Sequence, residues 1–418
     1  MGELGSAPGT FIGIGRRPRT AGQRLAFRSQ TTDTPRSRPK PNHTAHNRSR
    51  FPLDPRAIAA PHTATTLKHV RTSEQVSEES IGRWADLSEA RMHVVSGKGG
   101  TGKTTVAAAL ALALAARGKR TLLLEVEGRQ GISRLFDVPP LPYEERRVAI
   151  APDGGDVIAL AVDPEAALLE YLEMFYNMRR AGSALRRLGA IDFATTIAPG
   201  VRDVLLTGKA MEATRRRAKD GSFVYDAVVM DAPPTGRIVQ FLNVNSEVAG
   251  LAKVGPIRTQ ADTVMSVIKS RTTTVHLVTL LEEMPVQETV DGFADLRAAG
   301  LPLGGVFVNM VREPMLPPEA LTAAATGTLD EATIRAGLVT AGLAPSGGTR
   351  EPRLSAWAAA LSTEASEHAA RVALEAQERL ELRATRRPVI ELPYLSDGID
   401  LGALYTLAAR LHENGVGE

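Results

Sequence analysis

Cysteine is absent from the 418-residue sequence. Without a thiol, the chain cannot form disulfides, thiolate zinc sites, iron–sulfur clusters or sulfur-based sites for soft metals. Long apolar runs are also lacking: the longest, residues 106–116, is too short to cross a bilayer, and no signal-peptide pattern precedes it. We therefore expect a cytoplasmic protein without stable membrane insertion.

Aromatic residues are scarce at 4%, but hydrophobic residues make up 43%, which is enough for a sizeable core. The positive charge is confined to one end of the chain. Residues 1–91 contain 15 Lys and Arg against 8 Asp and Glu, a balance of +7, so the remaining residues carry −4 of the total +3. Because residues 1–91 are also rich in Pro, Ser and Thr without apolar periodicity, we expect a disordered basic tail. The acidic remainder, residues 92–418, gives no reason to expect nucleic-acid binding.

A glycine-rich loop stands between a short apolar run and an alanine-rich helical stretch. Residues 92–117 read MHVVSGKGGTGKTTVAAALALALAAR and match G-x-x-x-x-G-K-[ST] at Gly97, Gly102, Lys103 and Thr104. Such a loop directs backbone N–H groups at phosphates, Lys103 is expected at the β- and γ-phosphates, and Thr104 is expected to bind Mg²⁺. The residues expected to contact the nucleotide here are Gly97, Lys98, Gly99, Gly100, Thr101, Gly102, Lys103, Thr104 and Thr105.

Acidic residues end two further apolar runs, as in open α/β sheets that bind ligands at the carboxyl ends of their strands. The run from residue 120 ends in Glu125 and Glu127, and the run 223–230 is followed by Asp231. An apolar strand ending in Asp is the Walker B arrangement, which makes Asp231 a second candidate Mg²⁺ ligand. The tight turn predicted over residues 233–236 brings the N–H of Gly236 towards a γ-phosphate.

Strand and helix patterns alternate through the rest of the chain. Further strands are expected at residues 156–162, 274–281, 304–309 and 388–392, with a closing helix over 401–411. This alternation predicts an α/β fold with a doubly wound, mostly parallel sheet. A mostly helical insertion is expected over residues 164–217. Its first helix has two apolar stripes, which favour a helix covered on both sides; a groove for a partner protein, lined by methionines, is the alternative.

GKGGTGKTT resembles the deviant phosphate loop of the superclass that includes MinD, ParA and the nitrogenase iron protein. Together with the later motifs, residues 92–411 resemble the ArsA and tail-anchored-protein-targeting (guided entry) ATPases, in particular the bacterial branch called anion-transporting ATPases. The resemblance implies a P-loop ATPase that uses ATP and Mg²⁺ and acts as a homodimer or as a heterodimer with a paralogous ATPase. It also implies that Lys98 reaches across the dimer interface to the partner's phosphates.

The resemblance assigns the remaining site residues and shows two departures. The family's water-positioning Asp corresponds to Glu127, and the His of its second switch corresponds to Arg237. Alternatively, Glu127 only pairs with Arg129 or Arg237, and Glu125 is then the reserve candidate. The implied catalytic residues are Lys98, Lys103, Glu127 and Asp231.

In the family, an Asn that corresponds to Asn309 holds adenine. Residues 393–401, beginning at Pro393, resemble the family's C-terminal loop that closes over the base. Residues 199–201 resemble the start of a helix beside the client groove. Thiolate binding of arsenite and a CxxC zinc clamp are both impossible here.

The leading hypothesis is a dimeric ATPase that couples its nucleotide state to binding of a client or partner protein on the helical insertion. A partition or positioning ATPase like ParA or MinD is one alternative. A scaffold subunit that binds nucleotide but hardly turns it over is another.

Overall fold

The computed structural model describes residues 82–176, 199–251, 256–343 and 350–417. The chain divides into a unit of residues 1–72 and a unit of residues 73–418, and the described residues all belong to the second. Of the tail predicted over residues 1–91, residues 1–81 therefore lie outside the described part. In that part, no helix is long and apolar enough to cross a membrane.

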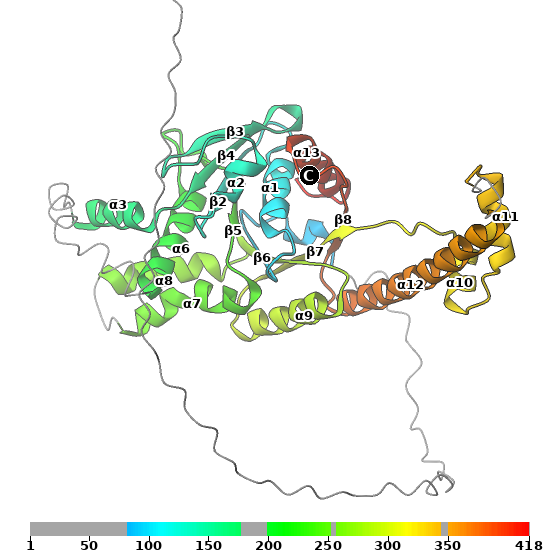
Figure 1. The fold of residues 1–418 in the computed structure, drawn as a ribbon. Coiled ribbons are helices and arrows are strands. Elements are labelled where there is room, and N and C mark those ends of the chain that lie inside the picture. Colours follow the sequence, from blue (N-terminus) through cyan, green and yellow to red (C-terminus); the bar gives the residue numbers. More distant parts are fainter. Residues whose placement is uncertain (1–81, 177–198, 252–255, 344–349, 418) are drawn as a thin grey trace, which may run out of the picture. The chain divides into compact units, whose positions relative to one another are not determined.

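Within the described residues, one eight-stranded sheet runs in the order β3-β4-β2-β5-β1-β6-β7-β8 (Figure 1). Every neighbouring pair is parallel except β3 and β4, which are antiparallel. Helices cover both faces, so the predicted doubly wound, mostly parallel α/β fold is confirmed. The strands are β1 (Met92–Gly97), β2 (Arg120–Glu125), β3 (Arg146–Ile150), β4 (Asp156–Ala161), β5 (Ala227–Asp231), β6 (Thr273–Thr279), β7 (Leu303–Val311) and β8 (Val389–Pro393).

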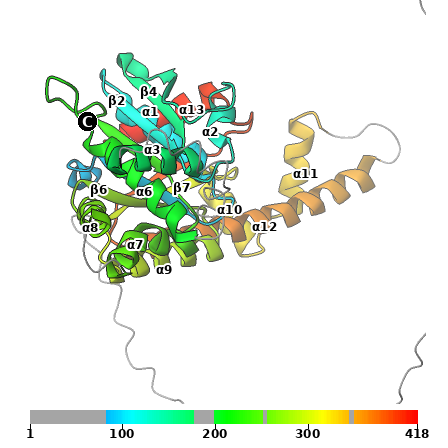
Figure 2. The same cartoon turned by 90° about the vertical axis from the view of Figure 1, so that its left-hand side faces the viewer.

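Two hydrophobic cores lie on opposite faces of the sheet. One face packs against α1 (Lys103–Ala115), α2 (Gly131–Leu135) and α13 (Leu401–Glu413). The other packs against α6 (Pro199–Arg215), α7 (Thr235–Leu251), α8 (Pro256–Ile268) and α9 (Glu283–Ala298) (Figure 2). The first of these helices, α1, is buried from Val106 to Ala115 because it lies between the sheet and α13. Its alanines allow this close packing on all sides, so α1 has no polar face.

The remaining helices extend the helical layer. They are α3 (Pro164–Tyr176), α10 (Pro318–Ala325), α11 (Glu331–Thr340) and the 35-residue α12 (Arg350–Ala384). Helices α10 and α11 contact α12, which also contacts α9. In the insertion predicted over residues 164–217, α3 and α6 are described, whereas residues 177–198 between them lie outside the described part.

Three local predictions are wrong. The edge strand β3 was missed, because its sequence RRVAI is short, charged and partly exposed and so lacks a strand-like apolar run. The strand predicted over 223–230 begins only at Ala227. The turn predicted over 233–236 is shorter, because α7 begins at Thr235 and Gly236 already lies in its first turn.

The predicted tail also extends too far. Residues 84–87 form a short 3₁₀ helix, η2 (Trp84–Leu87), and Trp84 is only 7% exposed. Its ring stacks on His276 at 5.0 Å between centroids and on His93 at 6.2 Å. Burial lowers the pKa of His93 to about 4 and that of His276 well below its usual value, so both rings are neutral at pH 7. Residues 82–91 therefore belong to the folded domain, with Trp84 covering the neutral histidine pair.

Replacing Trp84 with alanine is expected to lower the free energy of unfolding by ~3–5 kcal/mol, the usual cost of deleting a buried Trp. Trp357 on α12 is the matched control, because it is 45% exposed and its loss should cost less than ~0.5 kcal/mol. Deleting residues 1–81 should leave the stability close to that of the full chain, whereas deleting 1–91 should destabilise it as Trp84→Ala does. Denaturant unfolding of the four variants tests this, and equal stability of the two deletions would contradict it.

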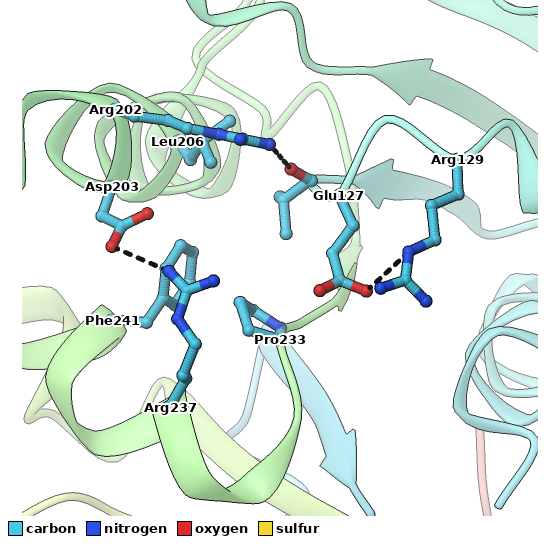
Figure 3. A pocket seen from close by; sticks show the side chains of 9 residues that line it. Glu127, Arg129, Arg202, Asp203, Leu206, Pro233, Arg237 and Phe241 are labelled. Atoms are coloured by element: carbon cyan, nitrogen blue, oxygen red, sulfur yellow. Dashed lines mark hydrogen bonds and ion pairs between the residues drawn. The ribbon is translucent and has the colours of Figure 1, made fainter. Parts of the chain in front are cut away.

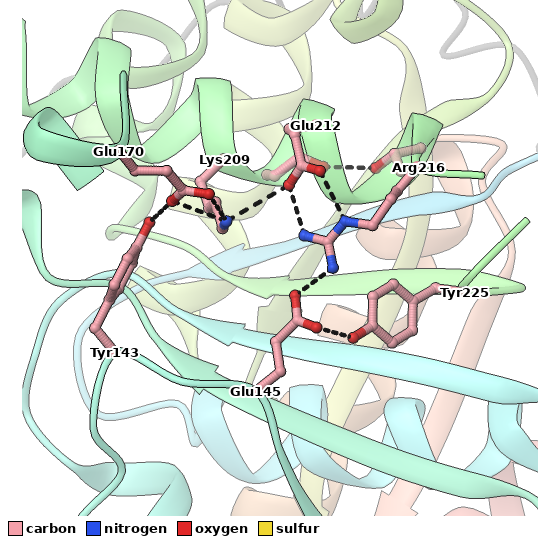
Figure 4. Close-up of polar contacts among 9 residues, drawn as sticks. Tyr143, Glu145, Glu170, Lys209, Glu212, Arg216 and Tyr225 are labelled. Atoms are coloured by element: carbon pink, nitrogen blue, oxygen red, sulfur yellow. Dashed lines mark hydrogen bonds and ion pairs between the residues drawn. The ribbon is translucent and has the colours of Figure 1, made fainter. Parts of the chain in front are cut away.

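A polar network ties α3 and α6 to the edge of the sheet (Figure 4). Lys209 on α6 contacts Glu170 on α3 at 2.8 Å, and Glu170 also accepts the hydroxyl hydrogen bond of Tyr143. Just beyond α6, Arg216 contacts Glu145 at 2.6 Å, and Glu145 accepts a hydrogen bond from Tyr225. Burial is the main cause that raises the pKa of both tyrosines, and the hydrogen bond to glutamate adds to it. Both hydroxyls therefore keep their protons and donate hydrogen bonds. The C-terminal part of α6 is thus fixed to the loop before β3.

Candidate nucleotide-binding site

The loop between β1 and α1 has a backbone that requires glycine at two positions. Gly97 has φ 149°, and a Cβ there would lie 2.2 Å from the Val278 carbonyl oxygen on β6. Gly102 caps α1 with φ 84°, a left-handed conformation that costs other residues about 1 kcal/mol or more. The Thr101 hydroxyl closes the loop by donating to the Lys98 carbonyl at 2.9 Å. The loop therefore turns tightly directly before the N-terminus of α1, which is the position at which helices bind phosphate.

Lys103 lies in the first turn of α1 and points back over the loop. Its Nζ donates to the Lys98 carbonyl at 3.4 Å. Burial lowers the pKa of Lys103, while the nearby charges of Asp231 and Glu127 oppose that shift. This ammonium group is therefore the fixed positive charge inside the loop.

Thr104 and Asp231 join the loop to the end of β5. The Thr104 hydroxyl donates to Asp231 Oδ2 at 2.7 Å. Burial raises the pKa of Asp231 to about 6, although the Thr104 hydrogen bond and the Lys103 charge act in the opposite direction. The two oxygens are the hard donors that Mg²⁺ prefers, and a nucleotide-bound Mg²⁺ takes its other ligands from phosphates and water. Among the described residues, no group of three or more His, Cys, Asp or Glu side chains could hold a metal ion.

Lys98 lies on the outer side of the loop. Its Nζ is 3.3 Å from Glu288 Oε2 on α9, and both side chains are about one-third exposed. Lys98 and Lys103 thus have different partners: Lys103 Nζ contacts the backbone of the loop, whereas Lys98 Nζ pairs with a carboxylate on α9. Gly99 and Gly100 next to Lys98 border open space, so the loop is accessible at this point.

The two glutamates that follow β2 have different roles in the fold. Glu125 is 2% exposed, and its oxygens accept hydrogen bonds from the backbone N–H groups of Gly131 and Ile132 at 3.3 and 3.2 Å. It therefore holds the start of α2. Glu127 is more accessible and lies 3.6 Å from Arg129. The Glu127–Arg129 ion pair matches the alternative interpretation of Glu127 as a pairing residue. Glu125, the reserve candidate, is already hydrogen-bonded to backbone N–H groups.

A cavity of about 220 Å³ lies beside Glu127 (Figure 3). Two residues of the first turn of α6 line it and contact the segments that follow β2 and β5. Arg202 donates to the Val126 carbonyl at 3.3 Å, and Asp203 lies 3.5 Å from Arg237 near the start of α7. Burial raises the pKa of Asp203, and the two arginines oppose that shift. Sequence reasoning missed Arg202 and Asp203, although they directly follow the recognised stretch 199–201.

The expected base-binding residues lie at the ends of β7 and β8. Asn309 is 5% exposed, and its Nδ2 donates to the Thr101 carbonyl at 2.9 Å. Pro393 ends β8, and the next residue, Tyr394, donates its N–H to Val311 at 2.8 Å. The Arg312 guanidinium lies over the Tyr394 ring, 4.1 Å from its centroid. Tyr394 lies in the loop predicted over residues 393–401, but its contact with Arg312 was not predicted, because that contact depends on the pairing of β7 with β8.

Fold and site together define a P-loop nucleotide-binding protein of the α/β class. Residues 90–271 match the family model described as anion-transporting ATPase. The chain is 53% identical over 337 residues to a protein named ATPase BagA in Mycobacterium tuberculosis, covering 81% of this chain and 97% of that protein. It is 28% identical over 194 residues to a protein named ATPase GET3 in Kluyveromyces lactis, covering 43% of this chain and 54% of that protein. The chain belongs to the anion-transporting ATPase (ArsA) family.

Proposed function

We propose that this protein binds ATP with Mg²⁺, hydrolyses it as a dimer and couples the nucleotide state to binding of a client or partner protein. The observation that carries the proposal is the arrangement around Lys103: the Thr104 hydroxyl in the first turn of α1 donates to Asp231 at the end of β5, and Glu127 follows the neighbouring strand β2. A cation, a pair of oxygen donors and a carboxylate beside a phosphate loop support a site for the terminal phosphates.

In this proposal, the Lys103 ammonium and the loop N–H groups bind the β- and γ-phosphates. Lys98 supplies a further positive charge to the site of the partner subunit, which is either a second copy or a paralogue. Mg²⁺, when bound through Thr104 and Asp231, neutralises phosphate charge. Glu127 orients or activates the attacking water. The N–H of Gly236, in the first turn of α7, is available to the γ-phosphate region.

Helix α6 provides the proposed connection to the client. Its first turn contacts the segment after β2 through Arg202 and the start of α7 through Asp203. These are the two segments expected to respond to the γ-phosphate. A change in either one therefore acts directly on the helical part, where the client is proposed to bind.

A second candidate function is a scaffold subunit that retains ATP with little turnover. The Arg129–Glu127 ion pair favours it, because a carboxylate held by a guanidinium is less free to turn towards an attacking water. Single-turnover hydrolysis of bound ATP separates the two candidates. A parent chain that binds ATP but does not hydrolyse it, alone or with a paralogue, would establish the scaffold.

Glu127→Gln is expected to retain ATP binding and to slow single-turnover hydrolysis ~10²–10⁴-fold, because the amide keeps the side-chain size but cannot accept a proton. Glu144→Gln is the control, since Glu144 also pairs with an arginine, Arg146 at 3.4 Å, on the exposed surface. Arg129→Gln should hydrolyse ATP at least as fast as the parent. An unchanged rate in Glu127→Gln would show that Glu127 does not act on water.

A further inference from the structure

Asn309 connects β7 to the phosphate loop across the intervening strand β6. Its side chain is almost completely buried, and its Nδ2 donates to the Thr101 carbonyl at 2.9 Å. A Cβ on Gly102 would lie 2.4 Å from the same Nδ2. The absence of a side chain at Gly102 therefore allows this amide to reach the loop backbone directly before α1.

The backbone next to Asn309 is in an unusual conformation. Met310 has φ 58°, in the left-handed region that non-glycine residues rarely adopt. The register between β7 and β8 also shifts between Val308 and Val311. Such strain persists only where the surrounding structure maintains it, and it concentrates at functional sites. Here it occurs at the residue that follows Asn309, where the side chain must be directed at the loop.

The hydrogen bond also determines which way the amide faces. A carbonyl oxygen can only accept, so the NH₂ of Asn309 must face Thr101 and Oδ1 must face away from it. One end of the side chain is thus committed to the protein's own phosphate loop. Leaving the Thr101 carbonyl without this donor would cost the desolvation free energy of a buried acceptor, so the contact stabilises this conformation of the loop.

We propose that Asn309 is a positioning residue that holds the phosphate loop in its triphosphate-binding conformation through the Thr101 carbonyl. This role is separate from any contact with the base, and it rests on the proposed ATP-binding function. It predicts that Asn309 affects ligands that have no base at all. A residue that only recognises adenine would not affect them.

The test uses inorganic tripolyphosphate with Mg²⁺ as a probe, beside ATP and GTP, in binding titrations. In Asn309→Asp, a carboxylate oxygen replaces Nδ2 and faces the Thr101 oxygen; in Asn309→Ala, the contact is simply removed. Both variants are expected to bind tripolyphosphate and ATP at least ~10-fold more weakly, equivalent to ~1.4 kcal/mol.

Asn245→Ala is the matched control. Asn245 on α7 is 1% exposed, and its Nδ2 donates to the Thr207 hydroxyl on α6 at 2.8 Å. Its replacement therefore also removes a buried amide contact. Thermal unfolding of all variants identifies any that fail to fold; Asn309→Ala carries the test if the Asp variant does. Unchanged tripolyphosphate affinity with weakened ATP binding would overturn the proposal and leave base recognition alone. A parent chain that binds neither ligand would overturn the ATP-binding function first.

Discussion

Lys103→Ala is expected to weaken ATP binding by at least about 100-fold. Charge-assisted hydrogen bonds contribute ~1.5–3 kcal/mol each, and the Lys103 ammonium is directed at two phosphates from a partly buried position. Its burial, which lowers the pKa of the amine, also means that water cannot easily replace it. Calorimetric titration with ATP and Mg²⁺ measures the effect.

Lys119→Ala is the control for the loss of a lysine. Lys119 stands just before β2, where its Nζ donates to the Gly417 carbonyl at 2.8 Å, at the opposite end of that strand from Glu125. Its removal should leave ATP affinity unchanged. If Lys103→Ala bound ATP as tightly as the parent, the assignment of the phosphate loop would be wrong.

Lys98→Ala should produce the opposite pattern: ATP binding within a few-fold of the parent, but hydrolysis reduced by ~10³–10⁵. This is the range for a catalytic charge supplied in trans. The structure of the single chain agrees with such a separation, because Lys98 Nζ contacts Glu288 on α9, whereas Lys103 Nζ contacts the backbone of the loop. Glu288→Gln is the control, since an exposed pair is worth only ~0.2–1 kcal/mol and Lys98 itself remains.

A mixing experiment tests the trans arrangement directly. A dimer of one Lys98→Ala chain and one Glu127→Gln chain contains one site with both an intact Glu127 and an intact Lys98 from its partner. Mixing two inactive variants should therefore restore part of the hydrolysis. No recovery, despite dimers detected by light scattering, would indicate that Lys98 acts within its own chain.

The backbone of the phosphate loop and the contact between Thr104 and Asp231 were predictable because both depend on short sequence patterns. Gly97 and Gly102 have backbone angles that favour glycine, and Asp231 ends an apolar strand that lies between β1 and β2. The structure brings Thr104 and Asp231 together as that pattern implies.

Features that depend on tertiary packing were not predictable. Trp84 lies in a polar segment, and its contacts with the histidine pair and with Phe307 make it a core residue. Arg202 and Asp203 resemble any surface charges until α6 is placed against the ends of β2 and β5. The edge strand β3 lacks the apolar pattern by which a strand is identified in a sequence. Glu127 remains a hypothesis, because the ion pair with Arg129 and a catalytic role both suit an accessible carboxylate.

The polar network around Lys209, Glu145 and Arg216 determines how α6 can move. Its C-terminal part is fixed to the loop before β3, while its first turn contacts the two segments beside the nucleotide site. With 17 residues, α6 is about 25 Å long, and the network holds its C-terminal part. We therefore expect a displacement of either segment to rotate α6 about its C-terminal part instead of sliding the helix along the sheet. Helix α3 would rotate with α6, because Glu170 is bonded to Lys209.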